Sequence, residues 1–290
     1  MGKEAILKQL QEIQELKNKV AKRVWSKALL IREIDEDKFD KKGDALTERV
    51  IKERIKFLAE RIIKAYPDAD PVLISLMDGA LPFASLLQNA LNERGYKYSY
   101  TTMQASSYEH KMTSGELKIG SMPKIPLGGR TVFVLDDVCD TGKTYLKIRD
   151  LLESLGAKKV SLIVLVDKVQ KRINGYMPEY VGFEVPAYAF IVGMGLDYYG
   201  ELRNEPEIRG VDLSSLPTPE EQELLDSEAS LNEELIKLIA LEKTTKPGSS
   251  MMTVFGGSAD KLRKSALDIA PEHLPTDSTQ AHQNMTSQFY

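Results

Sequence analysis

The chain has 290 residues, a formal net charge of −4 at pH 7 and a single cysteine. This length can bury a sizeable core, and the acidic balance excludes a general nucleic-acid binder, which would carry a basic field. One cysteine excludes a disulfide framework and favours a reducing cytoplasm, and the longest apolar run, residues 160–166, is too short to cross a bilayer.

The N-terminal part predicts two helices with an extended segment between them. Residues 3–22 are charged but place apolar side chains along one face, and residues 25–34 predict an entry strand. From Ile51 to Ile62 apolar residues recur at helical spacing, and Pro67 stops that helix. The first helix is expected to dock on the protein's own core or on a second subunit.

A strand, a glycine turn and a helix follow. Residues 71–77 predict a buried strand that ends at Asp78-Gly79, and Pro82 opens the next helix. Residues 98–103 alternate between apolar and polar and predict a third strand. The polar stretch 104–118, taken alone, predicts a surface loop.

Two acids and a polar turn stand between a strand and a helix near the middle of the chain. Residues 132–135 predict a strand buried on both faces, and Asp136 and Asp137 are placed where it should end. The turn 140–144 leads into a helix. The predicted buried face of that helix consists of Tyr145, Ile148, Leu152 and Leu155. Main-chain N–H groups at a helix start bind phosphate, so acids followed by such a turn predict a ligand like ribose 5-phosphate.

The same turn ends in Gly142-Lys143-Thr144, which match the last three residues of a nucleotide-triphosphate P-loop. That motif needs a further glycine five residues before Gly142, where the chain has Asp137. A carboxylate at this position would repel the phosphates, which excludes a P-loop. A turn that only links strand to helix remains the alternative.

The C-terminal half predicts one more buried strand and a helical extension. Residues 160–166 predict the strand, and Lys168 would lie at the edge where open α/β sheets bind ligands. A lone lysine there is more often a solvated flank. Residues 217–243 predict a helix with a capping box at Ser230 and Glu233, and polar residues, Gly and Pro predominate from residue 244 onward.

These motifs resemble type I phosphoribosyltransferases, and the Asp-Thr-Gly-Lys-Thr turn resembles the hypoxanthine-guanine branch. The spacing from Lys168 to Gly175-Tyr176 and to residues 181–186 continues the resemblance, which covers roughly residues 30–210.

Three positions depart from the family pattern. Asp136 stands where glutamate is more common, Asp78 stands where a basic residue is usual, and one residue is inserted between Pro186 and Phe190. A carboxylate beside a diphosphate is repulsive unless a metal lies between them.

The resemblance implies a role for each matching residue. The ribose 5-phosphate would be bound by Asp136, Asp137, Asp140, Thr141, Gly142, Lys143 and Thr144. Asp140 would be the catalytic proton partner of the purine N7. The purine would be bound by Lys168, Phe190, Ile191 and Asp197. The diphosphate would be bound by Asp78, Gly79, by Ser107 and Tyr108 of a mobile lid, and by Arg203. Mg²⁺ is the implied cofactor, with the ligands Asp136, Asp137 and Asp197.

The implied fold is α/β, the type I phosphoribosyltransferase fold, with a central, mostly parallel twisted sheet, helices on both faces and a small hood. The expected domains are an N-terminal helical extension (1–29), the phosphoribosyltransferase domain (30–212), a helical C-terminal extension (213–243) and a flexible tail (244–290).

The implied activity is purine salvage in the cytoplasm, in which hypoxanthine or guanine reacts with phosphoribosyl diphosphate to give IMP or GMP and diphosphate. The expected partners are these substrates and further copies of the chain, as a dimer or tetramer, with no nucleic acid and no membrane. Two alternatives stay open, which are a transferase for another base such as xanthine and a non-catalytic protein that binds phosphoribosyl diphosphate or a nucleotide. Asp78 and the inserted residue favour the non-catalytic protein.

Overall fold

The computed structural model describes residues 1–34, 42–67, 70–107, 117–169 and 175–245. It divides into two compact units, one made of residues 1–7 and 229–290 and the other of residues 8–228. The predicted tail lies outside the described residues except for its first two positions. In the described ranges, no helix has both the length and the apolar character needed to span a membrane.

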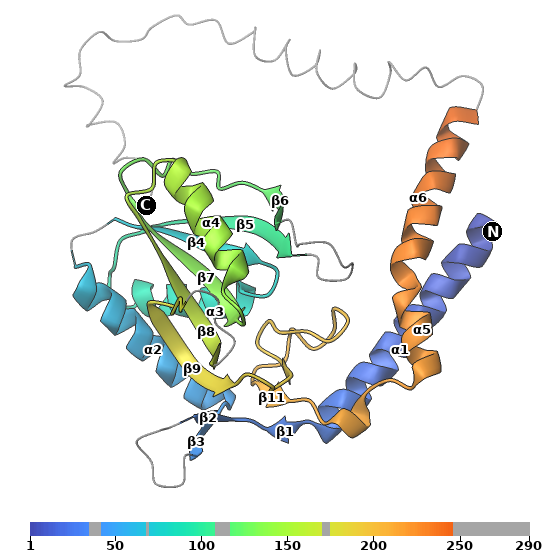
Figure 1. Ribbon diagram of the computed structural model, residues 1–290, viewed down its shortest axis with the longest axis horizontal. Coiled ribbons are helices and arrows are strands. Elements are labelled where there is room, and N and C mark those ends of the chain that lie inside the picture. The colour runs from blue at the N-terminus through green and yellow to red at the C-terminus, as the bar shows by residue number, and fades with distance from the viewer. Residues whose placement is uncertain (35–41, 68–69, 108–116, 170–174, 246–290) are drawn as a thin grey trace, which may run out of the picture. The chain divides into compact units, whose positions relative to one another are not determined.

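A six-stranded sheet forms the centre of the larger unit, in the order β6-β5-β4-β7-β8-β9 (Figure 1). All neighbours pair in parallel except β5 and β6, which pair antiparallel. The strands are β4 (Val72–Met77), β5 (Ser99–Ser107), β6 (Leu117–Ser121), β7 (Thr131–Cys139), β8 (Lys159–Val169) and β9 (Tyr180–Pro186). The expected mostly parallel sheet is confirmed.

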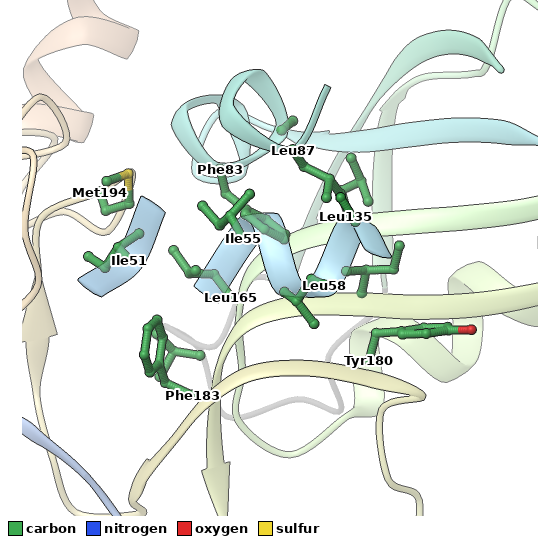
Figure 2. Close-up of a cluster of buried hydrophobic side chains, with 14 of the residues drawn as sticks. Ile51, Ile55, Leu58, Phe83, Leu87, Leu135, Leu165, Tyr180, Phe183 and Met194 are labelled. Atoms are coloured by element: carbon green, nitrogen blue, oxygen red, sulfur yellow. The ribbon is translucent and has the colours of Figure 1, made fainter. Parts of the chain in front are cut away.

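Helices cover both faces of this sheet (Figure 1). Helices α2 (Glu48–Ala65) and α3 (Leu81–Asn92) bury Ile55, Phe83 and other apolar side chains against one face. Figure 2 shows these side chains meeting Leu135 of β7 and Leu165 of β8. Helix α4 (Lys143–Ser154) covers the opposite face with Tyr145, Ile148 and Leu152.

Two small sheets lie outside the central one. One has the order β1-β11-β10 and joins β1 (Leu29–Leu30), β11 (Arg209–Gly210) and β10 (Ile191–Val192). The other pairs β2 (Arg32–Ile34) with β3 (Lys42–Ala45). The hood, residues 187–203, contains β10. Through β10 it is joined to β11, and β11 also pairs with β1, which precedes the central sheet in the chain.

The chain's terminal helices are α1 (Lys3–Lys27), α5 (Pro219–Asp226) and α6 (Glu228–Thr245), with the 3-10 helix η1 (Leu213–Ser215) before α5. Within the larger unit, Arg23 of α1 donates to the Glu221 carboxylate of α5 at 2.6 Å. Within the smaller unit, Lys3 pairs with Glu242 at 2.7 Å. The described residues before β1 and after η1 are therefore mainly helical.

Four local predictions were wrong. Helix α1 runs on to Lys27, so Trp25 is helical and the expected entry strand is reduced to β1 and β2. The C-terminal extension is two helices, and its capping box is formed by Thr218 and Glu221, not by Ser230 and Glu233. Leu155 is 44% exposed because α4 ends at Ser154 and Gly156 turns the chain with φ +91°. Strand β7 reaches Cys139, so Asp136 and Asp137 lie within it rather than after it.

We expect the protein to lose stability in acid, because the stabilisation from the Arg23–Glu221 pair is lost when Glu221 is protonated. The Arg23 guanidinium lowers the pKa of Glu221 from an ordinary 4.5 to about 2. A carboxylate with a lowered folded pKa stabilises the protein fully above about 4.5, and this stabilisation is lost as the pH falls towards 2. Glu221→Gln should therefore flatten the dependence of Tm on pH across that window. Glu223→Gln, an exposed carboxylate of the same helix, is the control, and equal slopes for wild type and Glu221→Gln would contradict the expectation.

Candidate active site

The strand order reverses between β4 and β7, which pair in parallel although β5 lies on the other side of β4. Open α/β sheets bind ligands at such a switch point, outside the carboxyl ends of the strands. The turn at Asp78-Gly79 follows β4, and the turn 140–142 follows β7. The two predicted ligand-binding turns therefore lie at the same edge of the sheet.

Gly79 almost touches the Asp137 carboxylate. A Cβ built on Gly79 would lie 2.2 Å from Oδ2 of Asp137 and 2.7 Å from its Cγ, whereas real Cβ contacts are essentially never shorter than 3.0 Å. Only glycine lets the main chain after β4 approach the acid so closely. The predicted diphosphate turn and the predicted sugar-binding acid are therefore in direct contact.

Asp136 and Asp137 form a half-buried, interacting pair. The Asp136 carboxylate accepts from the Asp137 N–H at 3.1 Å, and the Asp137 carboxylate accepts from the Val138 N–H at 3.0 Å. Burial and the negative charge of Asp137 raise the pKa of Asp136 well above its usual range. Burial also raises the pKa of Asp137, although Arg203 opposes this shift. Hydroxyl donors or a cation beside these two carboxyl groups would stabilise their ionised forms.

The turn after β7 has the geometry of an anion site. Gly142 adopts φ +78° at the N-cap of α4, and the Lys143 N–H donates to Oγ1 of Thr141 at 3.4 Å. The first turn of an α-helix has N–H groups with no helical partner, and the helix dipole adds positive potential there. Thr141 to Thr144 are thus placed together, as predicted for a phosphate site.

Tyr176 and Glu179 support this turn and were not predicted to do so. A Cβ on Gly142 would lie 3.2 Å from Cδ1 of Tyr176, whose ring stacks on Tyr145 at 4.8 Å between centroids. The Tyr176 hydroxyl donates to Glu179, which also accepts from the Leu162 N–H of β8 at 2.7 Å. The resemblance at Gly175-Tyr176 was the only sequence signal for this packing.

Lys168 lies at the same edge as the turn. Cys139 and Asp167 are opposite each other across β7 and β8, so the residues that follow them, Asp140 and Lys168, lie at the same edge of the sheet. Lys168 is half-buried and pairs in register with Val185 of β9. Lys168 is therefore at the sheet edge that Asp140 follows, where the sequence predicts recognition of a purine oxygen.

Phe190 and Ile191, the residues predicted to contact the base, lie in the hood. The Phe190 ring is 44% exposed and meets Tyr198 edge-on, with 5.8 Å between ring centroids. The Phe190 carbonyl accepts from the Val211 N–H at 2.8 Å. The Ile191 side chain is buried, so its main chain is what it can offer to a ligand. An exposed aromatic ring on a fixed backbone can stack on a flat base.

Asp197 and Arg203 are paired inside the hood. Arg203 contacts Asp197 at 2.7 Å and donates to the Gly195 carbonyl at 2.6 Å. A Cβ on Gly195 would lie 1.8 Å from the Gly79 carbonyl oxygen, so the hood touches the turn after β4. Met194 also packs into the core cluster with Ile51 (Figure 2). Asp197 and Arg203 are therefore held close to the turn that contains Gly79.

Two predicted parts of the site, the lid and the magnesium ligands, are described only in part. Tyr108 lies outside the described residues, and Ser107 is described only as the last residue of β5, opposite Leu117. Within the described part of the chain, no three His, Cys, Asp or Glu side chains gather to hold a metal by themselves. Asp197 is paired with Arg203 rather than grouped with Asp136 and Asp137.

We expect Gly79→Ala to lower kcat/KM for phosphoribosyl diphosphate, the substrate that the sequence resemblance implies, by about tenfold or more. The new methyl group would push the Asp137 carboxylate out of place, and this side chain yields more easily than backbone would. Gly128→Ala is the matched control, because a Cβ there meets nothing within 4 Å and neither glycine needs a positive φ. Steady-state kinetics of the two variants measure the difference, and equal kinetics would contradict the close approach.

The comparisons with known proteins agree with this geometry. The family model described as the phosphoribosyl transferase domain matches residues 43–199. The hypoxanthine-guanine phosphoribosyltransferase of Aquifex aeolicus is 36% identical over 169 residues, which is 58% of this chain and 93% of the relative. That of Bacillus subtilis is 33% identical over 164 residues, which is 56% of this chain and 89% of the relative.

A crystal structure of a hypoxanthine phosphoribosyltransferase from Staphylococcus aureus is similar with a TM-score of 0.55 and 28% identity, covering 60% of this chain and 92% of that one. The expected fold is confirmed by this likeness. The chain belongs to the phosphoribosyltransferase domain family.

Proposed function

We propose that this protein is a purine salvage enzyme that joins hypoxanthine or guanine to phosphoribosyl diphosphate and releases diphosphate. The observation that carries the proposal is the meeting of three parts at one sheet edge. These are the Asp136–Asp137 pair with its phosphate turn, the Gly79 turn that touches Asp137, and Lys168 at the end of β8, which pairs with β7 up to Cys139. The relatives named for this activity add support.

In the proposed reaction, the turn 140–144 holds the 5-phosphate and Asp136 and Asp137 hold the ribose hydroxyls. Binding energy from these groups, which do not react, fixes the anomeric carbon between the diphosphate and the base. The C1–O bond breaks as the purine nitrogen attacks, and the ribose gains positive oxocarbenium character. The Asp140 carboxylate stabilises that charge and accepts the proton from the purine N7.

Lys168 selects the base in this proposal. Its ammonium group donates to a 6-oxo oxygen, but it would face the amino hydrogens of adenine and leave a buried donor unpaired. Phe190 stacks on the purine ring, and Arg203 contributes a forked cation near the diphosphate. Adenine should therefore be a much poorer substrate than hypoxanthine.

Mg²⁺ fits the donor set. Mg²⁺ binds through one or two carboxylates and the oxygens of a substrate, and the Asp136–Asp137 pair offers carboxylates whose mutual repulsion a cation would relieve. When bound, the ion neutralises the leaving diphosphate. It would also screen that diphosphate from the exposed Asp78. Asp197 would join this set only if it left Arg203. We further propose that the protein is cytoplasmic and that it forms a homo-oligomer. Sedimentation of the purified chain would test the oligomeric state.

One assay tests the activity. Purified protein is incubated with Mg²⁺, phosphoribosyl diphosphate and hypoxanthine, guanine, xanthine or adenine in turn, and nucleotide formation is followed. The expected result is rapid formation of IMP and GMP and slow reaction with adenine. A preference for xanthine would identify a transferase for that base.

A non-catalytic protein that binds phosphoribosyl diphosphate is the second candidate, because Asp78 places a carboxylate in the diphosphate turn. Binding of phosphoribosyl diphosphate without product from any base would favour this candidate and reject the enzyme.

A further inference from the structure

We propose that the chain's added terminal helices position the hood and thereby set the affinity for the purine part of the ligand. These helices, here called the brace, are residues 8–27 of α1, η1 and α5. They lie outside the matched family residues, 43–199. The inference rests on the proposed function, because it takes Phe190 as the surface for the base.

An apolar cluster joins the brace to the hood. Val20, Ala21 and Val24 of α1 pack with three hood side chains in one buried group. Those hood side chains are Val192, Tyr198 and Leu202, each 8% exposed or less. Apolar contacts of this kind are lost on any separation of the two parts, so the hood backbone is held where α1 places it.

Arg23 locks α1 to the segment that leads into α5. Its Nε donates to the Ser215 carbonyl at 3.0 Å, and Nη2 donates to the Leu216 carbonyl at 3.2 Å. Nη2 also donates to Glu221 at 2.6 Å, and both side chains of this ion pair are partly buried. Lys17 of α1 also pairs with Glu228, the first residue of α6, at 2.7 Å. Forked, partly buried pairs of this type fix geometry better than exposed ones do.

A chain of aromatic contacts leads from α5 to Phe190. The Tyr199 hydroxyl donates to Asp226 of α5 at 3.2 Å and accepts from Gln222. The Tyr199 ring meets Tyr198 at 5.0 Å between centroids, and Tyr198 supports Phe190 edge-on at 5.8 Å. Any movement of α5 would thus be passed to the ring that stacks on the base.

The opposite side of the hood is fixed independently. Gly195 lies against the Gly79 carbonyl, and Met194 is buried in the main core. The phosphate turn 140–144 leads into helix α4, and the apolar cluster under α4 shares no residue with the apolar cluster between the brace and the hood. Loosening the brace should therefore shift Phe190 while the phosphate turn keeps its place.

The test compares two ligands that share the ribose phosphate. Calorimetry gives the Kd of inosine monophosphate and of ribose 5-phosphate for wild type and for Tyr199→Phe, which removes only the hydroxyl that reaches α5. We expect the Kd of the nucleotide to rise about 3- to 10-fold while the Kd of ribose 5-phosphate stays within twofold. Tyr188→Phe, at a residue that is 88% exposed, is the matched control and should change neither Kd.

Arg23→Gln is a second variant, which breaks the ion pair between α1 and α5. Arg23→Gln should raise the same Kd ratio, and Arg23→Lys should restore part of it because the charge next to Glu221 is kept. If Tyr199→Phe and Arg23→Gln lowered thermal stability but left the ratio of the two Kd values unchanged, the proposal that the brace positions the hood would be overturned. Failure of wild type to bind inosine monophosphate at all would instead reject the proposed function.

Discussion

Replacing Asp140 by asparagine is expected to lower kcat by about 10²-fold or more while the protein stays folded. Asparagine has nearly the same shape and can still bond to neighbouring groups, but it neither accepts the purine proton nor carries a negative charge beside the forming cation. Asp140 follows β7 directly, at the sheet edge where Lys168 also lies. Steady-state kcat at saturating phosphoribosyl diphosphate and hypoxanthine measures the effect.

The control is Asp150→Asn, which removes an exposed carboxylate from the middle of α4. That variant loses the same charge without touching the turn, so it should behave like wild type. A kcat for Asp140→Asn within a few-fold of wild type would remove Asp140 from the chemical step. A raised KM for both substrates with an unchanged kcat would leave it a binding role only.

The parts of the site that the sequence predicted are those made by neighbouring residues. Asp136, Asp137 and the turn 140–144 come from one continuous strand, turn and helix, and each of these has its own local pattern. The contact of Gly79 with Asp137 was not predicted, but it agrees with the rule that parallel strands bring their carboxyl ends to one edge. Such features need only local periodicity and one topological rule.

Contacts between distant segments were not predictable in this way. Tyr176 behind Gly142 and Gly195 against Gly79 depend on how the hood and the loop after β8 fold back, and no local pattern records that. The stripe through Leu155 kept its helical spacing although α4 had already ended. Two sites also fitted the same capping pattern, and Thr218 formed the capping box with Pro219 at the first helical position, whereas Ser230 lies inside α6.

The hood–turn contact leads to the second large effect, which is expected for Gly195→Ala. The added Cβ would lie 1.8 Å from the Gly79 carbonyl oxygen and 2.9 Å from its carbon, and both are backbone atoms that cannot rotate away. The hood and the turn after β4 would have to separate by roughly 1 Å, which is a displacement that can cost about 10²-fold in catalysis. Because Arg203 bonds to the Gly195 carbonyl, it would move with the hood. We therefore expect kcat/KM to fall by about 10²-fold for both substrates.

Gly200→Ala separates this collision from backbone strain. Gly195 and Gly200 both have positive φ, +98° and +85°, so alanine costs conformational energy at either position. A Cβ on Gly200, however, meets nothing within 4 Å. Gly200→Ala should therefore lower Tm with only a small change in kcat/KM, whereas Gly195→Ala should lower both. If the two variants lost activity equally, strain in the hood would explain the loss, and the contact between Gly195 and Gly79 would not be what holds the two halves of the site together.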